Sequence, residues 1–196
     1  MNIRLLRYGL WAGIAALSIF LVLTYISGRQ TTAPRAVELG TSFNLIDQNG
    51  NPITEAAFKG HPTALFFGFT HCPEVCPTTL FEMADWLNKL GDEGRDLRVF
   101  FVSVDPERDT PEVMKGYTAA FTDRITGITG KPEEIDKLVK SWRIYAKKVP
   151  TENGDYTMDH TASVMLLDRD SRLKSTIDYK ENSDVALKKL KLLIAG

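Results

Sequence analysis

Two nearly continuous apolar runs constrain the fold of this chain more than any other feature of its sequence. They cover residues 63–69 and 97–104, and neither shows the polar–apolar alternation of a half-exposed strand. Short continuous apolar runs indicate strands that are covered on both faces. A helical pattern follows each run, so we predict a layered α/β domain with these strands in the middle of its sheet.

Two hairpins are predicted outside these central strands. An Asn-Gly turn joins residues 42–46 to residues 52–54, and a Glu-Asn-Gly-Asp turn joins residues 145–149 to residues 156–158. The other predicted strands are residues 125–129, 163–167 and 173–179. The predicted helices are residues 80–90, 109–121 and 132–142 and a last helix capped by Ser183.

An uncharged stretch, residues 8–26, precedes this domain. Its length is close to the ~20 residues that a helix needs to span a bilayer. Arg4 and Arg7 favour a cytoplasmic N-terminus. We therefore predict a cytoplasmic segment 1–7, a single-pass anchor 8–26 in a bacterial-type inner membrane, a linker 27–40 and a periplasmic domain 41–196. A cleaved signal peptide is the alternative, but its apolar part is usually shorter.

The only two cysteines, Cys72 and Cys76, lie four residues apart at the end of the first apolar run. At that spacing two thiols can bind one soft metal ion or close a disulfide. Inert buried thiols are a less favoured interpretation. In an exported protein, one such pair indicates metal or redox chemistry rather than a disulfide scaffold. Cys76 is expected at a helix start, where free N–H groups would lower the pKa of its thiol.

His160 is the best candidate for a third ligand. It precedes the predicted strand 163–167, whose leading loop reaches the cysteines if that strand is central, and Asp159 could support its imidazole. Two thiolates and an imidazole suit Cu(I), or Cu(II) with a weak fourth ligand, better than structural zinc, which takes four ligands. Other candidate ligands are interpreted as loop or core residues: His61, His71, Met158 and Met165.

Several function classes are less well supported. A net charge of −1 with no basic cluster argues against a nucleic-acid partner. Residues 105–111 are interpreted as a turn and helix cap, without a part in chemistry. A thiol–disulfide oxidoreductase stays an alternative, although the Cys-x-x-x-Cys spacing is one residue longer than usual. A peroxidase is disfavoured because its Pro and Thr are replaced here by Leu65 and Phe69. Whether the chain is an enzyme is left open, and binding is favoured over catalysis.

Three motifs resemble those of the Sco/SenC copper-binding proteins. They are residues 67–77, which contain Thr-His-Cys-Pro-Glu-Val-Cys-Pro, residues 102–111, which read Val-Ser-Val-Asp-Pro-Glu-Arg-Asp-Thr-Pro, and Asp159-His160. The resemblance implies a thioredoxin-like fold with an added N-terminal hairpin and a second hairpin inserted before His160. It also implies copper bound by Cys72, Cys76 and His160.

The resemblance further implies a membrane-anchored copper metallochaperone. Its implied partner is subunit II of cytochrome c oxidase, whose dinuclear copper (CuA) centre it would help to assemble, and other periplasmic copper chaperones are possible partners. Reduction of the target-site cysteines is the alternative role. Glu74 stands where aspartate is common in the family, between the two cysteines.

Overall fold

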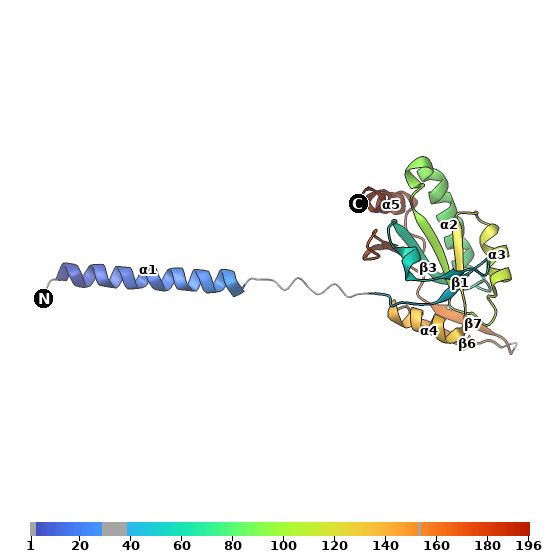
Figure 1. Ribbon diagram of the computed structural model, residues 1–196, viewed down its shortest axis with the longest axis horizontal. Helices are drawn as coiled ribbons and strands as arrows, with labels where there is room; N and C mark the ends of the chain where they lie inside the picture. Colours follow the sequence, from blue (N-terminus) through green and yellow to red (C-terminus); the bar gives the residue numbers. More distant parts are fainter. Residues whose placement is uncertain (1–2, 29–38, 153) are drawn as a thin grey trace. The chain divides into compact units, whose positions relative to one another are not determined.

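The computed structural model describes residues 3–28, 39–152 and 154–196, which belong to two compact units that divide after Glu38 (Figure 1). The first unit contains helix α1 (Ile3–Gly28), which is about 39 Å long. Its segment Arg7–Thr24 is long and apolar enough to cross a membrane, and none of the residues of this segment is buried within the structure. The helix is confirmed, while its passage through a membrane stays a prediction. The predicted linker falls mainly on residues 29–38, outside the described residues.

The second unit contains a seven-stranded sheet in the order β2-β1-β5-β4-β3-β8-β9. Strands β3, β4 and β5 are parallel, and β1 and β8 run antiparallel to their neighbours. The two apolar runs form the central strands β3 and β4, and every residue of β3 is buried. The α/β prediction is therefore confirmed. The strand bounds are β1 Leu45–Asp47, β2 Pro52–Ile53, β3 Thr63–Gly68, β4 Arg98–Ser103, β5 Ile125–Thr129, β8 Val164–Leu167 and β9 Leu173–Ile177.

Four α-helices pack around this sheet, and α4 lies below it in the view of Figure 1. They are α2 (Val75–Leu90), α3 (Pro111–Ala119), α4 (Pro132–Ser141) and α5 (Ser183–Ala195). Thr110 caps α3 by accepting a hydrogen bond from the Val113 N–H. The predicted cap of α5 is wrong by one residue, because the Asn182 side chain accepts the free N–H groups there. Ser183 instead accepts a bond from the Trp86 indole.

A second sheet has two strands and is not paired with the seven-stranded sheet. It consists of β6 (Ala146–Pro150) and β7 (Tyr156–His160), paired from Ala146 opposite His160 to Pro150 opposite Tyr156. The predicted hairpin is confirmed, but its second strand is longer than residues 156–158. His160 is therefore the last residue of a strand rather than part of a free loop.

The sheet order brings distant parts of the chain together at one end of the strands. Strand β8 runs antiparallel beside β3, with Leu65 opposite Met165. The chain entering β8 and the chain leaving β3 consequently meet at the same end of the sheet. The first carries His160 and the second carries Cys72, which is why residues far apart in sequence become neighbours.

Candidate metal centre

This end of the sheet brings together Cys72, Cys76 and His160. One ligand atom from each lies within 4.8 Å of the others, and the Cys76 Sγ is 3.5 Å from the His160 Nε2. Cys72 comes from the loop that leads into α2, Cys76 from the first turn of α2, and the imidazole from the end of β7. This is the donor set that the sequence predicted, gathered at one point. Their role as ligands stays a prediction.

Cys76 is the buried member of the group. It is the second residue of α2, its side chain is fully buried, and its Sγ lies against the end of β3. A Cβ added at Gly68 would lie 2.8 Å from this sulfur and 2.7 Å from the Phe101 ring, so only glycine leaves room for it. Sequence reasoning missed Gly68, although a glycine inside an apolar strand is a known signal of close approach.

The two thiols have opposite acidities. The Cys76 thiol donates a hydrogen bond to Cys72, and this bond is the main reason that the pKa of Cys72 is lowered to about 4. Hydrogen bonds from His160 and from the Cys76 N–H, whose nitrogen lies 3.4 Å from the Cys72 Sγ, lower this pKa further. The hydrogen bond between the two thiols, together with burial, raises the pKa of Cys76. The prediction of a lowered pKa at Cys76 is therefore wrong. Its sulfur points into the core, and the N–H groups at the start of α2 serve the preceding cysteine instead.

The imidazole of His160 is held in one orientation. Its Nδ1 lies 2.8 Å from the Thr161 carbonyl oxygen, which can only accept, so Nδ1 donates, and Nε2 is the nitrogen that faces the Cys76 Sγ. The rings of Phe66 and Phe69 meet it edge to face, at 6.1 and 5.7 Å between centroids. Asp159 was the predicted supporting group, but it is exposed, since neighbouring strand residues face opposite sides. The supporting acceptor is the Thr161 carbonyl.

The other candidate ligands lie elsewhere among the described residues. His71 is half exposed, with its Nδ1 4.0 Å from Asp109, and it is not part of the converging group. His61 pairs with Asp96 on another loop. Met165 is buried in the core, and Met158 packs against that core. These observations agree with the sequence interpretation of all four residues.

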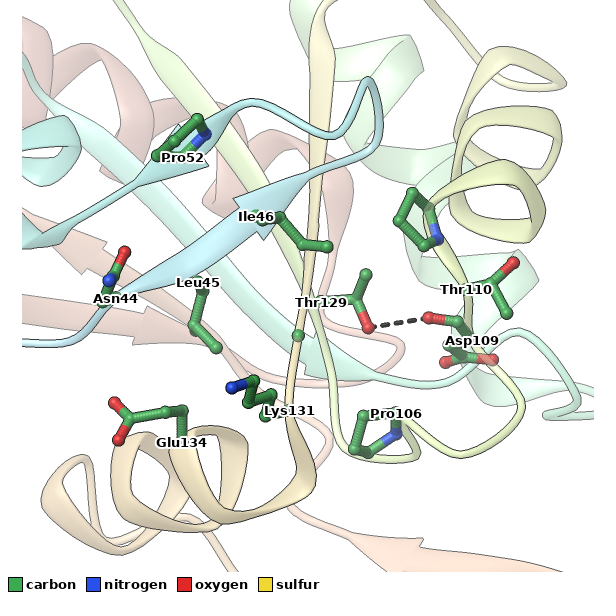
Figure 2. Close-up of a pocket in the computed structure, with 12 residues that line it drawn as sticks. Asn44, Leu45, Ile46, Pro52, Pro106, Asp109, Thr110, Thr129, Lys131 and Glu134 are labelled. Carbon is green, nitrogen blue, oxygen red and sulfur yellow. Dashed lines mark hydrogen bonds between the residues drawn. The ribbon is translucent and has the colours of Figure 1, made fainter.

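A pocket of about 650 Å³ lies on the β1 side of the turn at residues 105–109 (Figure 2). Asp109 and Thr110 form part of its wall, and Figure 2 shows the Thr129 hydroxyl bonded to the Asp109 backbone. None of Cys72, Cys76 and His160 lines this pocket. The sulfur–imidazole cluster is therefore separate from this hollow.

Comparisons with known proteins agree with this geometry. The family model described as SCO1/SenC matches residues 31–195. The mitochondrial SCO1 homolog 1 of Arabidopsis thaliana is 38% identical over 148 residues, 75% of this chain and 44% of that protein. The chain spans about half the length of such eukaryotic relatives.

Solved structures extend the likeness to the fold. The copper-bound ScoI of Bradyrhizobium japonicum is 49% identical with a TM-score of 0.74, over 79% of this chain and 99% of that one. BsSco, described as having a disulfide switch and as a member of the Sco family of cytochrome c oxidase assembly proteins, is 27% identical with a TM-score of 0.64, over 80% and 94%. The predicted Sco-like, thioredoxin-like fold is confirmed, and the chain belongs to the SCO1/SenC family.

Proposed function

We propose that this chain binds one copper ion through Cys72, Cys76 and His160. The observation that carries the proposal is the convergence of two sulfurs and one imidazole nitrogen within 4.8 Å, from two separate segments. Thiolates favour Cu(I), and imidazole suits both oxidation states. The copper-bound structure of a 49% identical relative supports copper over other soft metals.

The copper is cargo for the assembly of cytochrome c oxidase, and the acceptor is the CuA site of subunit II. Cys72 is only partly buried, so an incoming thiol can reach the metal from its side and exchange ligands. Helix α1 anchors the chain, with its C-terminal unit on the periplasmic side of a bacterial inner membrane. The excess of basic residues before the apolar segment supports this orientation.

Copper loading of the full-length chain in detergent tests the ligand set. The reduced protein is titrated with Cu(I) against a competing chelator, and with Cu(II) while the thiolate-to-copper charge-transfer band is recorded. Wild type is expected to bind one copper. Cys72→Ser and Cys76→Ser should lose the band, and His160→Ala should bind more weakly. His71→Ala is the matched control, because this neighbouring histidine lies outside the cluster. Unchanged, tight binding by His160→Ala would remove His160 from the site.

Thiol–disulfide exchange is the second candidate function, and the state of Cys72 favours it. This thiol has its pKa lowered to about 4 and is partly exposed, whereas Cys76 is buried with a raised pKa. The arrangement suits Cys72 as the attacking thiolate and Cys76 as the thiol that resolves the mixed disulfide. The target would be an oxidised pair of cysteines in the subunit II copper site.

The two functions differ in their need for His160 and for metal. A soluble subunit II fragment is prepared with the cysteines of its copper site either reduced, so that they can accept copper, or joined in a disulfide, so that they can accept electrons. Each form is mixed with reduced wild type or His160→Ala, with and without copper. Copper delivery requires loaded wild type and should fail with His160→Ala. Equal reduction of the target by both proteins without metal would favour the oxidoreductase.

A further inference from the structure

The turn between β4 and α3 contains two buried carboxylates that a helix cap does not explain. Asp105 is 2% exposed and Asp109 is fully buried, whereas Thr110 alone supplies the cap of α3. Burying a carboxylate is costly unless hydrogen bonds satisfy it. The partners of these two groups therefore show what the turn holds in place.

Asp109 holds the segment that carries the cysteines. Its carboxylate accepts bonds from the Thr70 hydroxyl at 2.6 Å, from the Thr70 N–H at 3.2 Å and from the Ser103 hydroxyl at 2.6 Å. Thr70 lies two residues before Cys72. The backbone of Asp109 is itself fixed to β5, since its carbonyl oxygen accepts the Thr129 hydroxyl at 2.7 Å (Figure 2). This side of the turn thus joins the cysteine segment to the sheet.

Asp105 and Arg108 hold the hairpin that carries His160. The Tyr156 hydroxyl donates to Asp105 at 2.8 Å, and Arg108 also pairs with Asp105. The Arg108 guanidinium lies over the Tyr156 ring, 3.7 Å from its centroid, and donates to the Tyr156 carbonyl oxygen at 3.0 Å. Tyr156 is the first residue of β7 and His160 is the last. The turn is therefore hydrogen-bonded to the strand that carries the imidazole.

The hairpin of β6 and β7 makes few other polar contacts with the rest of the domain. Among the described residues of β6, β7 and their connection, the side-chain hydrogen bonds to other parts of the fold go to residues 105–108, apart from the contact of His160 with Cys76. Besides those of Tyr156, they are Lys148 to Glu107 and Arg108 to Asp155. An isolated two-stranded hairpin is marginally stable in water. Its position over the cysteines consequently depends on this turn, together with the packing of Ala146 and Met158 against the core.

We propose that Asp105, Arg108 and Asp109 form a positioning turn that sets the distance between His160 and the two cysteine sulfurs. Arg108 and Asp105 fix the hairpin through Tyr156, and Asp109 fixes the cysteine segment through Thr70. The inference rests on the proposed function, because it assigns the turn a role in copper binding at that site. Releasing the Arg108 side should free the imidazole while leaving the dithiol intact.

The test uses Arg108→Met and Tyr156→Phe in the full-length chain in detergent. Tyr156→Phe is the milder variant, because it keeps the ring beneath the guanidinium and removes only the bond to Asp105. Arg124→Met is the matched control, since this partly buried arginine bonds to the Gly94 carbonyl oxygen, away from the hairpin. The first measurement is amide hydrogen exchange in the metal-free protein. Exchange across β6 and β7 should become about tenfold faster in Arg108→Met and stay unchanged in Arg124→Met.

The second measurement is a double-mutant cycle on Cu(I) affinity. Loss of a group that orients a metal ligand typically lowers affinity by about 10-fold to 100-fold, and Arg108→Met should fall in that range, without exceeding the loss in His160→Ala. In the His160→Ala background, Arg108→Met should cause no further loss. An equal additional loss there, or unchanged hairpin exchange, would overturn the proposal. If wild type bound no copper, the proposed function would fail, while faster hairpin exchange would still support the turn.

Discussion

Replacing Gly68 by alanine places one methyl group against the buried sulfur of the site. The new Cβ would lie 2.8 Å from the Cys76 Sγ and 2.7 Å from Cε2 of Phe101. Ordinary contacts begin at 3.4 Å, so the gap to the sulfur must open by about 0.6 Å and the gap to the Phe101 carbon by about 0.7 Å. Both neighbours are fully buried, which leaves the sulfur little freedom except to move toward the ligand cluster.

Overpacking of this kind costs about 1–3 kcal/mol in a well-packed core. For a domain of this size, each kcal/mol lowers Tm by about 2–4 °C. Gly68→Ala should therefore unfold at a lower temperature in a thermal melt of the metal-free chain. A displaced Cys76 sulfur should also shift or weaken the thiolate-to-copper band and lower Cu(I) affinity.

Gly130→Ala separates the two effects. Its Cβ would meet Cδ2 of Leu45 at 2.6 Å, so it also overpacks the core but touches no residue of the cluster. Both variants should be less stable, and only Gly68→Ala should change the copper spectrum. Wild-type stability together with a wild-type band in Gly68→Ala would refute the account of why a glycine stands there.

Three further predictions concern protons, oxidation and a helix cap. Between pH 7 and 8 Cys72 is already a thiolate, because its pKa is lowered to about 4, while the raised pKa of Cys76 keeps that thiol protonated. Copper binding should then release one proton from the pair, and Cu(I) affinity should rise about tenfold per pH unit in a chelator titration; a hundredfold rise would contradict it. Diamide oxidation to a Cys72–Cys76 disulfide should abolish Cu(I) binding until the protein is reduced, and stoichiometric copper on the oxidised chain would count against this. Asn182→Ala should destabilise the chain by about 1 kcal/mol in urea unfolding, because α5 loses its cap, and an unchanged midpoint would contradict the cap assignment.

The central architecture was predictable because local signals agreed with the tertiary fold. The apolar runs could be satisfied only as covered strands, and they became β3 and β4, in which every residue except Arg98 is buried. Prolines at residues 111 and 132 begin α3 and α4. The meeting of His160 with the cysteines followed from the single assumption that the strand after it is central. That assumption holds, because β8 pairs with β3.

The features of the site that the sequence did not predict depend on the direction in which a side chain points. The order of the residues places Cys76 at a helix start. Only the structure shows that its sulfur packs against Gly68 in the core, and that the Cys72 sulfur accepts the hydrogen bond from the Cys76 N–H. The turn at residues 105–109 has the composition of a helix cap, and Thr110 does cap α3. Its aspartates contribute elsewhere, because Asp105 and Asp109 bind partners that lie 51 and 39 positions away, Tyr156 and Thr70. Spacing along the chain identifies which residues can form a metal site, whereas the protonation of each thiol and the placement of the imidazole are set by contacts that exist only after the sheet, the turn and the hairpin have assembled.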